Sequence, residues 1–350
     1  MNTTLASVPS KPTRWTPFHT ATAAVAATVA TLALAIAPVL AATNVLVLTG
    51  ATAPRGGVVL TAANGTSHYW SPDHISGLCR VNEPTATTAG SYGPCVAAGV
   101  KVTQLAVGPG PIDPTTGHQL QFVYTGDLAA HANEGVLRFA YDPQGNGGQG
   151  LMSSFAQSIA GGCGIEGNLP WGAALGPDGN LYLSFKKTGS IIRVNHPDGN
   201  PTCADVQTIG NSSDGKKAFA LAFDGPNLWE VDGKGLGKIA NAPQCAVPPN
   251  GTCNAVSVLT NAIVAPLSLA SDPVNHTLYV GNANAVFQVS NIDNPFFASV
   301  TQYAAPFQFV TGLAVDRTNL VAGVTPTVWA ADDPSNGLTP GAGRLWKLLP

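Results

Sequence analysis

The stretch WGAALGPDGNLYLSFKKTGSIIRV, residues 171–194, contains the pattern that decides the fold. An apolar run leads into a Pro-Asp-Gly-Asn turn, an alternating strand follows, and a short polar loop leads to a second strand. Turn formers between runs of apolar and β-branched residues are typical of a β-hairpin. The stretch is either one local hairpin or one copy of a repeat, so the rest of the chain has to be searched for it.

The search finds the pattern six times. The apolar run with its turn recurs at 58–65, 105–110, 173–180, 221–227, 269–275 and 313–319, the middle strand at 67–71, 121–125, 180–184, 227–231, 277–281 and 327–331, and the last strand at 77–81, 135–139, 190–194, 235–239, 285–289 and 344–348. A polar residue marks each last strand: Arg80, Arg138, Arg193, Lys238, Gln288 and Lys347, spaced by 58, 55, 45, 50 and 59 residues. Each unit offers three strand signals and room for a fourth, and the connections show no helical periodicity. This predicts an all-β fold, a six-bladed β-propeller of four-stranded antiparallel blades.

A spare strand at the start of the repeat region predicts how the ring closes. The segment TNVLVLTG, residues 43–50, is a strand signal without a blade of its own. We expect residues 44–48 to pair beside the C-terminal RLWKLLP and so remove the open edge of the last blade. Residues 43–350 then form one propeller domain.

The middle strand carries a large aromatic residue in most units. We predict that these side chains fill the core between neighbouring blades, with Val123 as the exception to the aromatic pattern. The marker residues are expected to be structural, on a polar face or reaching between blades. The aromatic residues are Tyr69, Tyr182, Trp229, Tyr279 and Trp329.

Residues 1–42 are predicted to be a signal peptide. Lys11 and Arg14 precede the apolar run 21–42, and Pro38 lies just before small residues that fit a cleavage site. The alternative is an uncleaved anchor, because about 20 apolar residues can span a bilayer. We therefore expect a secreted or periplasmic protein that meets the membrane only if the leader is retained.

The charge balance argues against nucleic acid as a partner. Residues 43–350 carry 14 basic and 19 acidic side chains, and the adjacent basic pairs are Lys186-Lys187 and Lys216-Lys217. Nucleic-acid binding needs clustered Lys and Arg, so we expect these pairs to be solvated loop residues.

Six cysteines lie after the leader, and an even number in an exported chain predicts disulfides. Fifteen pairings are possible for six cysteines. Their order along the chain favours Cys79–Cys95, Cys163–Cys203 and Cys245–Cys253.

The segment GPDGNLYLSFKKTGSIIRV, residues 176–194, resembles the blades of NHL-repeat propellers and of the related gluconolactonase and streptogramin-lyase propellers. The resemblance covers residues 56–348 and is sharpest at 170–194. It implies the same propeller fold and a ligand site at one mouth of the central channel. That mouth is ringed by the loops between the second and third strands of each blade and by the loops leading into each blade.

Acids and histidines gather in those loops, with His68 and Trp70 beside them in the unusual stretch SHYWSPDHISGLCRV, residues 67–81. Carboxylate and amide oxygens that converge on an axis suit Ca²⁺, and a histidine adds general acid–base chemistry. The alternative is that these are ordinary polar loop residues of an exported β-protein. The binding candidates are His68, Trp70, Asp73, His74, Asp127, Asn282 and Asp332, the metal candidates are Asp73, Asp127, Glu166, Asp232 and Asp332, and the catalytic candidates are His74, His131 and Glu166.

The enzyme families that the resemblance suggests match only in part. Gluconolactonases place a Glu at the opening of the first blade, where this chain has APRGGVVL, residues 53–60, without an acid. Glu166, Asn282 and Asp332 are the candidates for a comparable trio, but no motif around them matches that family. The streptogramin-lyase pattern needs a Glu and a His at the mouth, for which Glu166 with His74 or His131 are the candidates. The loops read for this mouth contain no arginine, which argues against a quinone-dependent sugar dehydrogenase.

We therefore expect an exported propeller that binds an unknown small molecule or protein at one channel mouth. The alternative is a metal-dependent hydrolase or lyase of the lactonase or streptogramin-lyase type. No cofactor is certain, and a divalent metal such as Ca²⁺ is the candidate.

Overall fold

The computed structural model describes residues 44–97, 100–127, 136–165, 170–245, 253–259, 263–294, 298–303, 306–318, 320–335 and 339–350. The predicted leader, residues 1–42, lies outside the described residues. None of the helices in the described part of the chain has the length and apolar character needed to cross a bilayer.

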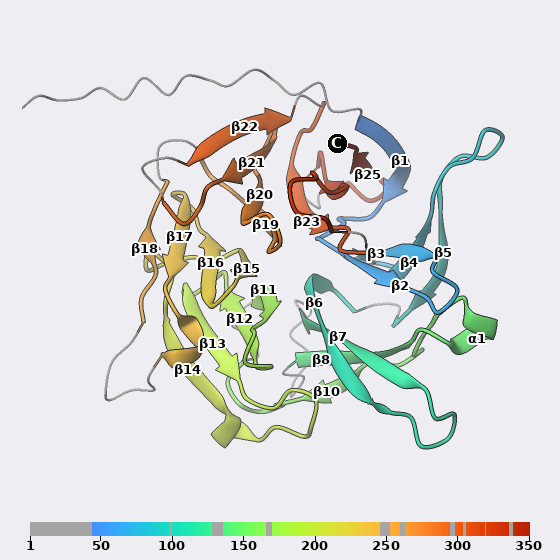
Figure 1. Ribbon diagram of the computed structural model, residues 1–350, viewed down its shortest axis with the longest axis horizontal. Helices are drawn as coiled ribbons and strands as arrows, with labels where there is room; N and C mark the ends of the chain where they lie inside the picture. The colour runs from blue at the N-terminus through green and yellow to red at the C-terminus, as the bar shows by residue number, and fades with distance from the viewer. Residues whose placement is uncertain are drawn as a thin grey trace, which may run out of the picture. The chain divides into compact units, whose positions relative to one another are not determined.

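Six antiparallel sheets form the blades of a propeller around a central channel (Figure 1). Blade 1 contains β2 (Val58–Thr61), β3 (Ser67–Asp73), β4 (Gly77–Asn82) and β5 (Ser91–Val96); blade 2 contains β6 (Val102–Ile112), β7 (Gln119–Asp127), β8 (Val136–Asp142), β9 (Leu151–Met152) and β10 (Gln157–Ile159). Blade 3 contains β11 (Pro170–Leu175), β12 (Leu181–Phe185), β13 (Ser190–Val194) and β14 (Val206–Asn211); blade 4 contains β15 (Ala220–Asp224), β16 (Asn227–Val231), β17 (Leu236–Ile239) and β18 (Val256–Ser257). Blade 5 contains β19 (Ser268–Asp272), β20 (Thr277–Gly281), β21 (Val286–Ser290) and β22 (Ser299–Tyr303); blade 6 contains β23 (Val310–Val315), β24 (Val328–Asp332), β25 (Gly343–Leu348) and β1 (Asn44–Ala51). Three short helical turns, α1 (Gly145–Gly148), Cys203–Asp205 and Ala242–Gln244, complete the described elements.

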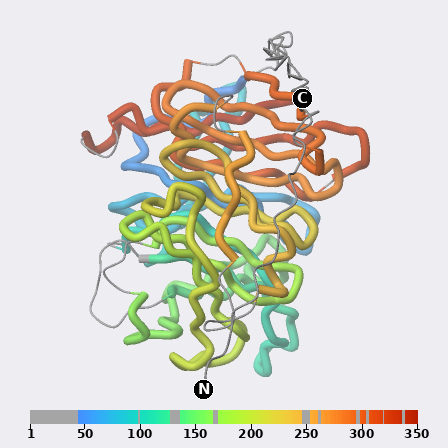
Figure 2. The backbone as a smooth tube through the Cα atoms, turned by 90° about the vertical axis from the view of Figure 1, so that its left-hand side faces the viewer, coloured from blue at the N-terminus to red at the C-terminus, as the bar shows by residue number. Residues whose placement is uncertain are grey.

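The predicted ring closure is confirmed. Strand β1 pairs antiparallel with β25, from Asn44 opposite Leu348 to Ala51 opposite Gly343. Figure 2 shows the blue N-terminal strand among the red C-terminal strands. Val47 and Leu48 are buried against blades 1 and 6, so the closing strand contributes to the core as well as to the hydrogen-bond ladder.

The strand register confirms that the six marker residues occupy equivalent positions. Each lies opposite an aromatic residue on the second strand of its blade, in the pairs Trp70–Arg80, Tyr124–Arg138, Tyr182–Arg193, Trp229–Lys238, Tyr279–Gln288 and Trp329–Lys347. The register also corrects the sequence alignment by one residue in two blades. The equivalents are Trp70 instead of Tyr69 and Tyr124 instead of Val123, so all six blades carry the aromatic residue.

A small first-strand residue makes room for each of these aromatic rings. Five of them lie opposite an alanine, as Trp229 lies opposite Ala222, and Trp70 lies opposite Val58. Trp229 then packs with Leu269 and Leu278 of the next blade. Burying such a side chain contributes about 1.5–3 kcal/mol, so these contacts stabilise the packing of neighbouring blades.

The marker residues tie neighbouring blades together by polar contacts. Arg138 Nη1 donates to the carbonyl oxygens of Pro197 and Gly199 in blade 3, at 2.7 and 2.6 Å. Arg193 Nη1 donates to the carbonyl oxygen of Pro243 in blade 4, at 3.1 Å. The expected structural role of the markers is confirmed for these two.

The three disulfides follow the pairing predicted from chain order. They join Cys79 to Cys95, Cys163 to Cys203 and Cys245 to Cys253. Disulfides form and persist in oxidising compartments, so they indicate an oxidising, extracellular type of environment.

Candidate functional site

The channel has two ends. At the hairpin end, the first strand of each blade is joined to the second. At the loop end, the second strand is joined to the third, and the loops between blades lead into the first strands. The site predicted from the sequence lies at the loop end.

Three of the predicted site residues do the same structural job at the loop end. Asp73 Oδ1 accepts hydrogen bonds from the backbone N–H groups of Ile75 and Ser76. Asp232 Oδ1 accepts from Lys234 and Gly235, and Asn282 Oδ1 accepts from Asn284 and Ala285. An Asp or Asn that bonds backbone two and three residues ahead stabilises a turn. All three are buried, and their role as ligands stays a prediction.

Asp332 is also buried and satisfied by its surroundings. Its Oδ1 accepts from the N–H groups of Gln308 and Phe309, at 3.0 and 2.6 Å. Its Oδ2 forms an ion pair with Arg344, whose Nε lies 3.0 Å away. The carboxylate is therefore occupied without a bound ion.

The remaining candidates are scattered. Trp70 is 3% exposed and packs in the core between blades 1 and 2, with its ring edge toward Tyr141. His68 is half-buried on β3, and burial followed by the charge of Arg80 lowers its pKa. Asp127 is the last residue of β7, and nothing of its side chain is described. His131 and Glu166 lie outside the described residues.

Aromatic and basic side chains plug the channel at the loop end. The Arg55 guanidinium lies 4.8 Å and the Lys186 ammonium 4.1 Å from the Trp171 ring centroid, and Phe219 packs edge-on against the same ring. The space left among these residues is about 10 Å³, too little for an organic ligand. The expectation that this mouth lacks arginine is wrong, because residues 53–57, which lead into the first blade, carry Arg55 to it.

Gln104 completes the plug from β6. A bulge between Val102 and Leu105 turns its side chain into the channel. Its Nε2 donates to the carbonyl oxygens of Leu221 and Leu269, and its Oε1 accepts from the N–H groups of Ala173 and Leu221. One side chain thus bridges the first strands of blades 3, 4 and 5.

His74, a catalytic candidate, lies among buried charges beside the plug. Arg55 Nε, His74 Nε2 and Asp333 Oδ2 are buried and have no hydrogen-bond partner among the described residues. Burial, followed by the charge of Arg55, lowers the pKa of His74 to about 4. The imidazole is therefore neutral at pH 7 and a weak base, which disfavours His74 as a general base.

The larger space in the channel opens on the other side of the plug. A cavity of about 390 Å³ is lined by the first strands of all six blades. Leu105, Ala222 and Leu313 lie in its wall with their side chains buried in the cores between blades, and Thr61 and Thr318 lie at the hairpin end. Its size is that of a small-molecule site, and the surface that its wall exposes is more polar than apolar.

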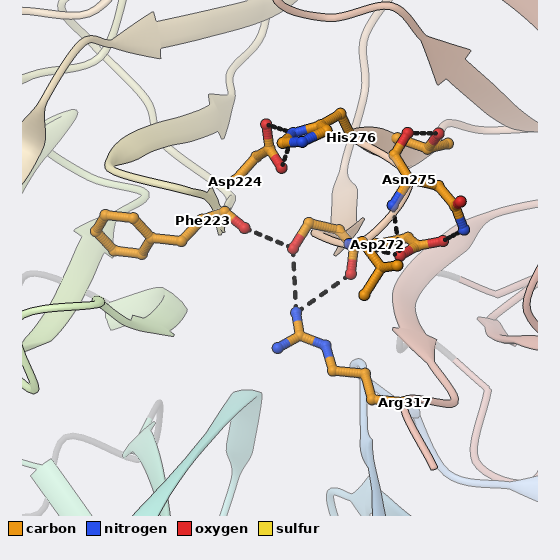
Figure 3. A network of polar contacts seen from close by, with 9 residues as sticks. Phe223, Asp224, Asp272, Asn275, His276 and Arg317 are labelled. Carbon is orange, nitrogen blue, oxygen red and sulfur yellow. Dashed lines mark hydrogen bonds and ion pairs between the residues drawn. The ribbon is translucent and has the colours of Figure 1, made fainter. Parts of the chain in front are cut away.

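Arg317 is the charged residue in the lining of this cavity. Its side chain is exposed to the channel, and its Nη2 donates to the carbonyl oxygen and Oγ of Ser271, at 3.2 and 3.1 Å (Figure 3). Ser271 Oγ donates in turn to the Phe223 carbonyl oxygen, at 2.7 Å. The surrounding strands lower the pKa of Arg317 by desolvation, while Asp272 opposes this shift. A guanidinium stays charged through such a shift and binds carboxylates through paired hydrogen bonds.

Figure 3 also shows a histidine–carboxylate contact near this rim. His276 Nδ1 lies 3.1 Å from both carboxylate oxygens of Asp224, and this contact, ahead of the neighbouring charges, raises the pKa of His276. Asp293 joins them, with ligand atoms of all three within 4.8 Å of one another. Among the described residues, this is the group of acids and histidines with the geometry of a metal site.

Comparisons with known proteins agree on the fold. No protein-family model and no curated protein matches the chain. The solved structures that resemble it include a gluconolactonase from Xanthomonas campestris, at 12% identity, TM-score 0.55 and coverage of 88% of this chain and 90% of that one. They also include a quinone-bound aldose sugar dehydrogenase from Streptomyces coelicolor, at 14% identity, TM-score 0.54 and coverage of 88% and 98%. A third is a Trichoderma reesei enzyme of carbohydrate-active family AA12, at 12% identity, TM-score 0.54 and coverage of 88% of this chain and 96% of that one. The structural similarity confirms the six-bladed propeller fold, and at these identities it shows the fold alone.

The sequence interpretation missed Arg317, His276 and Asp224. Each lies in or beside a hairpin-end turn, where Pro-Asp-Gly-Asn patterns were interpreted as turn chemistry only. The signal that marks Arg317 is departure from the repeat, because no other blade has an arginine in the turn after its first strand. His276 and Asp224 lack this signal, because His118 precedes β7 as His276 precedes β20, and Asp272 and Asp316 are the counterparts of Asp224.

Proposed function

We propose that this protein is an exported six-bladed propeller that binds a small molecule in its central channel, entering from the hairpin end. The cavity of about 390 Å³ with the exposed Arg317 guanidinium carries the proposal. The predicted leader and the three disulfides support export.

The lining defines the kind of ligand. The exposed lining is more polar than apolar, which favours a ligand with hydrogen-bonding groups, and the guanidinium favours one anionic group, such as a carboxylate. The two threonines at the rim add hydroxyl groups for a polar substituent. We therefore expect a small monocarboxylate that carries hydroxyl or other polar substituents.

Calorimetric titration of the purified domain with small hydroxylated carboxylates, and with aromatic carboxylates for comparison, tests this proposal. Arg317→Ala should weaken binding about 10- to 100-fold, because a charge-assisted pair contributes about 1.5–3 kcal/mol. Arg317→Lys should retain part of the affinity, since it keeps the positive charge but cannot form the paired hydrogen bonds of a guanidinium. Lys187→Ala removes one positive charge from an exposed loop-end site and should leave affinity unchanged. Equal affinities for wild type and Arg317→Ala would refute the proposal.

A metal-dependent hydrolase or lyase of the lactonase type is the second candidate. The Asp224–His276–Asp293 group favours it, because it lies at the same end as the cavity opening. Turnover of lactones that requires an added divalent metal and is lost in His276→Ala would establish this function. Full turnover in His276→Ala would exclude a catalytic metal at that group.

A further inference from the structure

A buried carboxylate in blade 4 lacks the partners that its equivalents have. Asp224, Asp272 and Asp316 each follow the first strand of a blade at the hairpin end. Asp272 Oδ1 accepts from the N–H groups of Val274 and Asn275, and Asp316 Oδ1 accepts from the N–H and hydroxyl groups of Thr318. Asp224 is about as buried as Asp272, yet in the described part of the chain no backbone N–H bonds its side chain.

The length of the turn explains the difference. In blade 4, Asp224 pairs directly with Asn227, which leaves two residues in the turn. In blade 5, Asp272 pairs with Thr277, and the four residues between them provide N–H groups that can fold back onto the carboxylate. The Asp224 carboxylate instead reaches the next blade, where it contacts His276.

His276 alone cannot fill the hydrogen-bond acceptor sites of the Asp224 carboxylate. A carboxylate offers about four acceptor sites, and one imidazole N–H supplies one donor. A cation at this point would use the acceptor sites that remain.

The positions of the three side chains fit a transition metal. Zinc takes nitrogen and oxygen ligands at about 2.0–2.2 Å, which places neighbouring ligand atoms about 3.3 Å apart. The Asp224–His276 contact of 3.1 Å already has this spacing, and the exposed Asp293 needs only a side-chain adjustment from within 4.8 Å. Three protein ligands leave a further position for water, and an imidazole in the set favours zinc over calcium.

We propose that Asp224, His276 and Asp293 bind one zinc-type divalent cation that bridges blades 4 and 5. This proposal is independent of ligand binding in the channel. The site stands apart from the loop-end acids nominated from the sequence, and its ligands come from turns that are 52 and 17 residues apart in the chain.

Chelator-treated, tag-free protein titrated with zinc chloride at pH 7.5 tests the site by calorimetry and thermal shift. We expect one zinc per chain with micromolar or tighter affinity and a rise in melting temperature. His276→Ala should weaken binding about 100-fold, and Asp293→Asn about 10-fold. Because Asp293 is fully on the surface, that variant will fold even if changes at the buried Asp224 disturb the blade.

The chain offers a matched control. His118 Nδ1 contacts Asp142 Oδ2 at 2.8 Å, and no third acid or histidine completes a metal group there among the described residues. His118→Ala should therefore retain zinc binding, as should Arg317→Ala. No binding by the wild type below millimolar zinc, or binding that His276→Ala and Asp293→Asn both retain, would overturn the proposal.

Discussion

The two ends of the channel are built from the same repeat and have opposite characters. At the loop end, Trp171, Arg55 and Gln104 fill the channel, and acidic side chains stabilise turns. At the hairpin end, the cavity is open and carries Arg317. The comparison teaches that a polar side chain is a candidate for a site when its surroundings leave it accessible. Asp73 and Asp232 are satisfied by the N–H groups of their own turns, whereas Arg317 faces the open cavity.

Removing the closing strand should have the largest effect, because both ends exist only while the ring is closed. A chain that begins after Ala51 lacks β1 and leaves the edge of β25 unpaired. We expect its melting temperature to fall by about 15 °C or more, or the cooperative transition to disappear, when followed by circular dichroism. A chain that begins at Asn44 is the control and should melt normally. An unchanged melting temperature in the shorter chain would contradict ring closure by β1.

Removing the Gln104 side chain from the plug should have the next largest effect on stability. Gln104→Ala loses four hydrogen bonds and leaves backbone groups of three blades without partners. We expect the free energy of unfolding to fall by about 3 kcal/mol in urea denaturation. Gln121→Ala, at the cavity wall, should cost less than about 1 kcal/mol. Similar losses in both variants would mean that Gln104 is not a structural bridge.

A smaller effect should appear as pH dependence at the loop end. Glu230 of β16 is fully buried, with Oε1 bonded by the Ser213 N–H and Oε2 unpaired, and burial raises its pKa to about 8. A carboxyl whose pKa is raised in the folded state stabilises the fold fully below about pH 4.5, and this contribution is lost as pH rises toward 8. We expect the wild type to lose on the order of 2 kcal/mol between pH 5 and pH 8.

The isosteric Glu230→Gln variant supplies the control, because it keeps the shape and removes the titration. Its unfolding free energy should vary less over the same pH range and should exceed that of the wild type at pH 8. Parallel pH profiles for the two proteins would show that Glu230 is ionised in the folded state.

The sequence predicts the fold because its signals are local and repeated. The turn pattern of residues 176–180 and the alternation in the strands recur in each unit. The cysteine pairing could be predicted as well, because each disulfide joins two cysteines that are consecutive in the chain. The one-residue errors at Trp70 and Tyr124 arose where the first two blades depart from the common spacing.

The site is harder to predict because it depends on how the six first strands meet. Whether the channel is open at one end is decided by Trp171, Phe219 and Gln104, which are contributed by three blades and come together only in the closed ring. Likewise, Asp224 and His276 are neighbours only because blades 4 and 5 are adjacent. The loop-end acids were nominated because they are polar and converge, but Asp73 and Asp232 are already satisfied by nearby N–H groups.

The most direct test of the central claim is a crystal structure of the domain with the tightest-binding carboxylate from the titration. The account predicts electron density in the cavity at the hairpin end, with the carboxylate paired to the Arg317 guanidinium. Density at the loop end instead, beside Arg55 and His74, would contradict it.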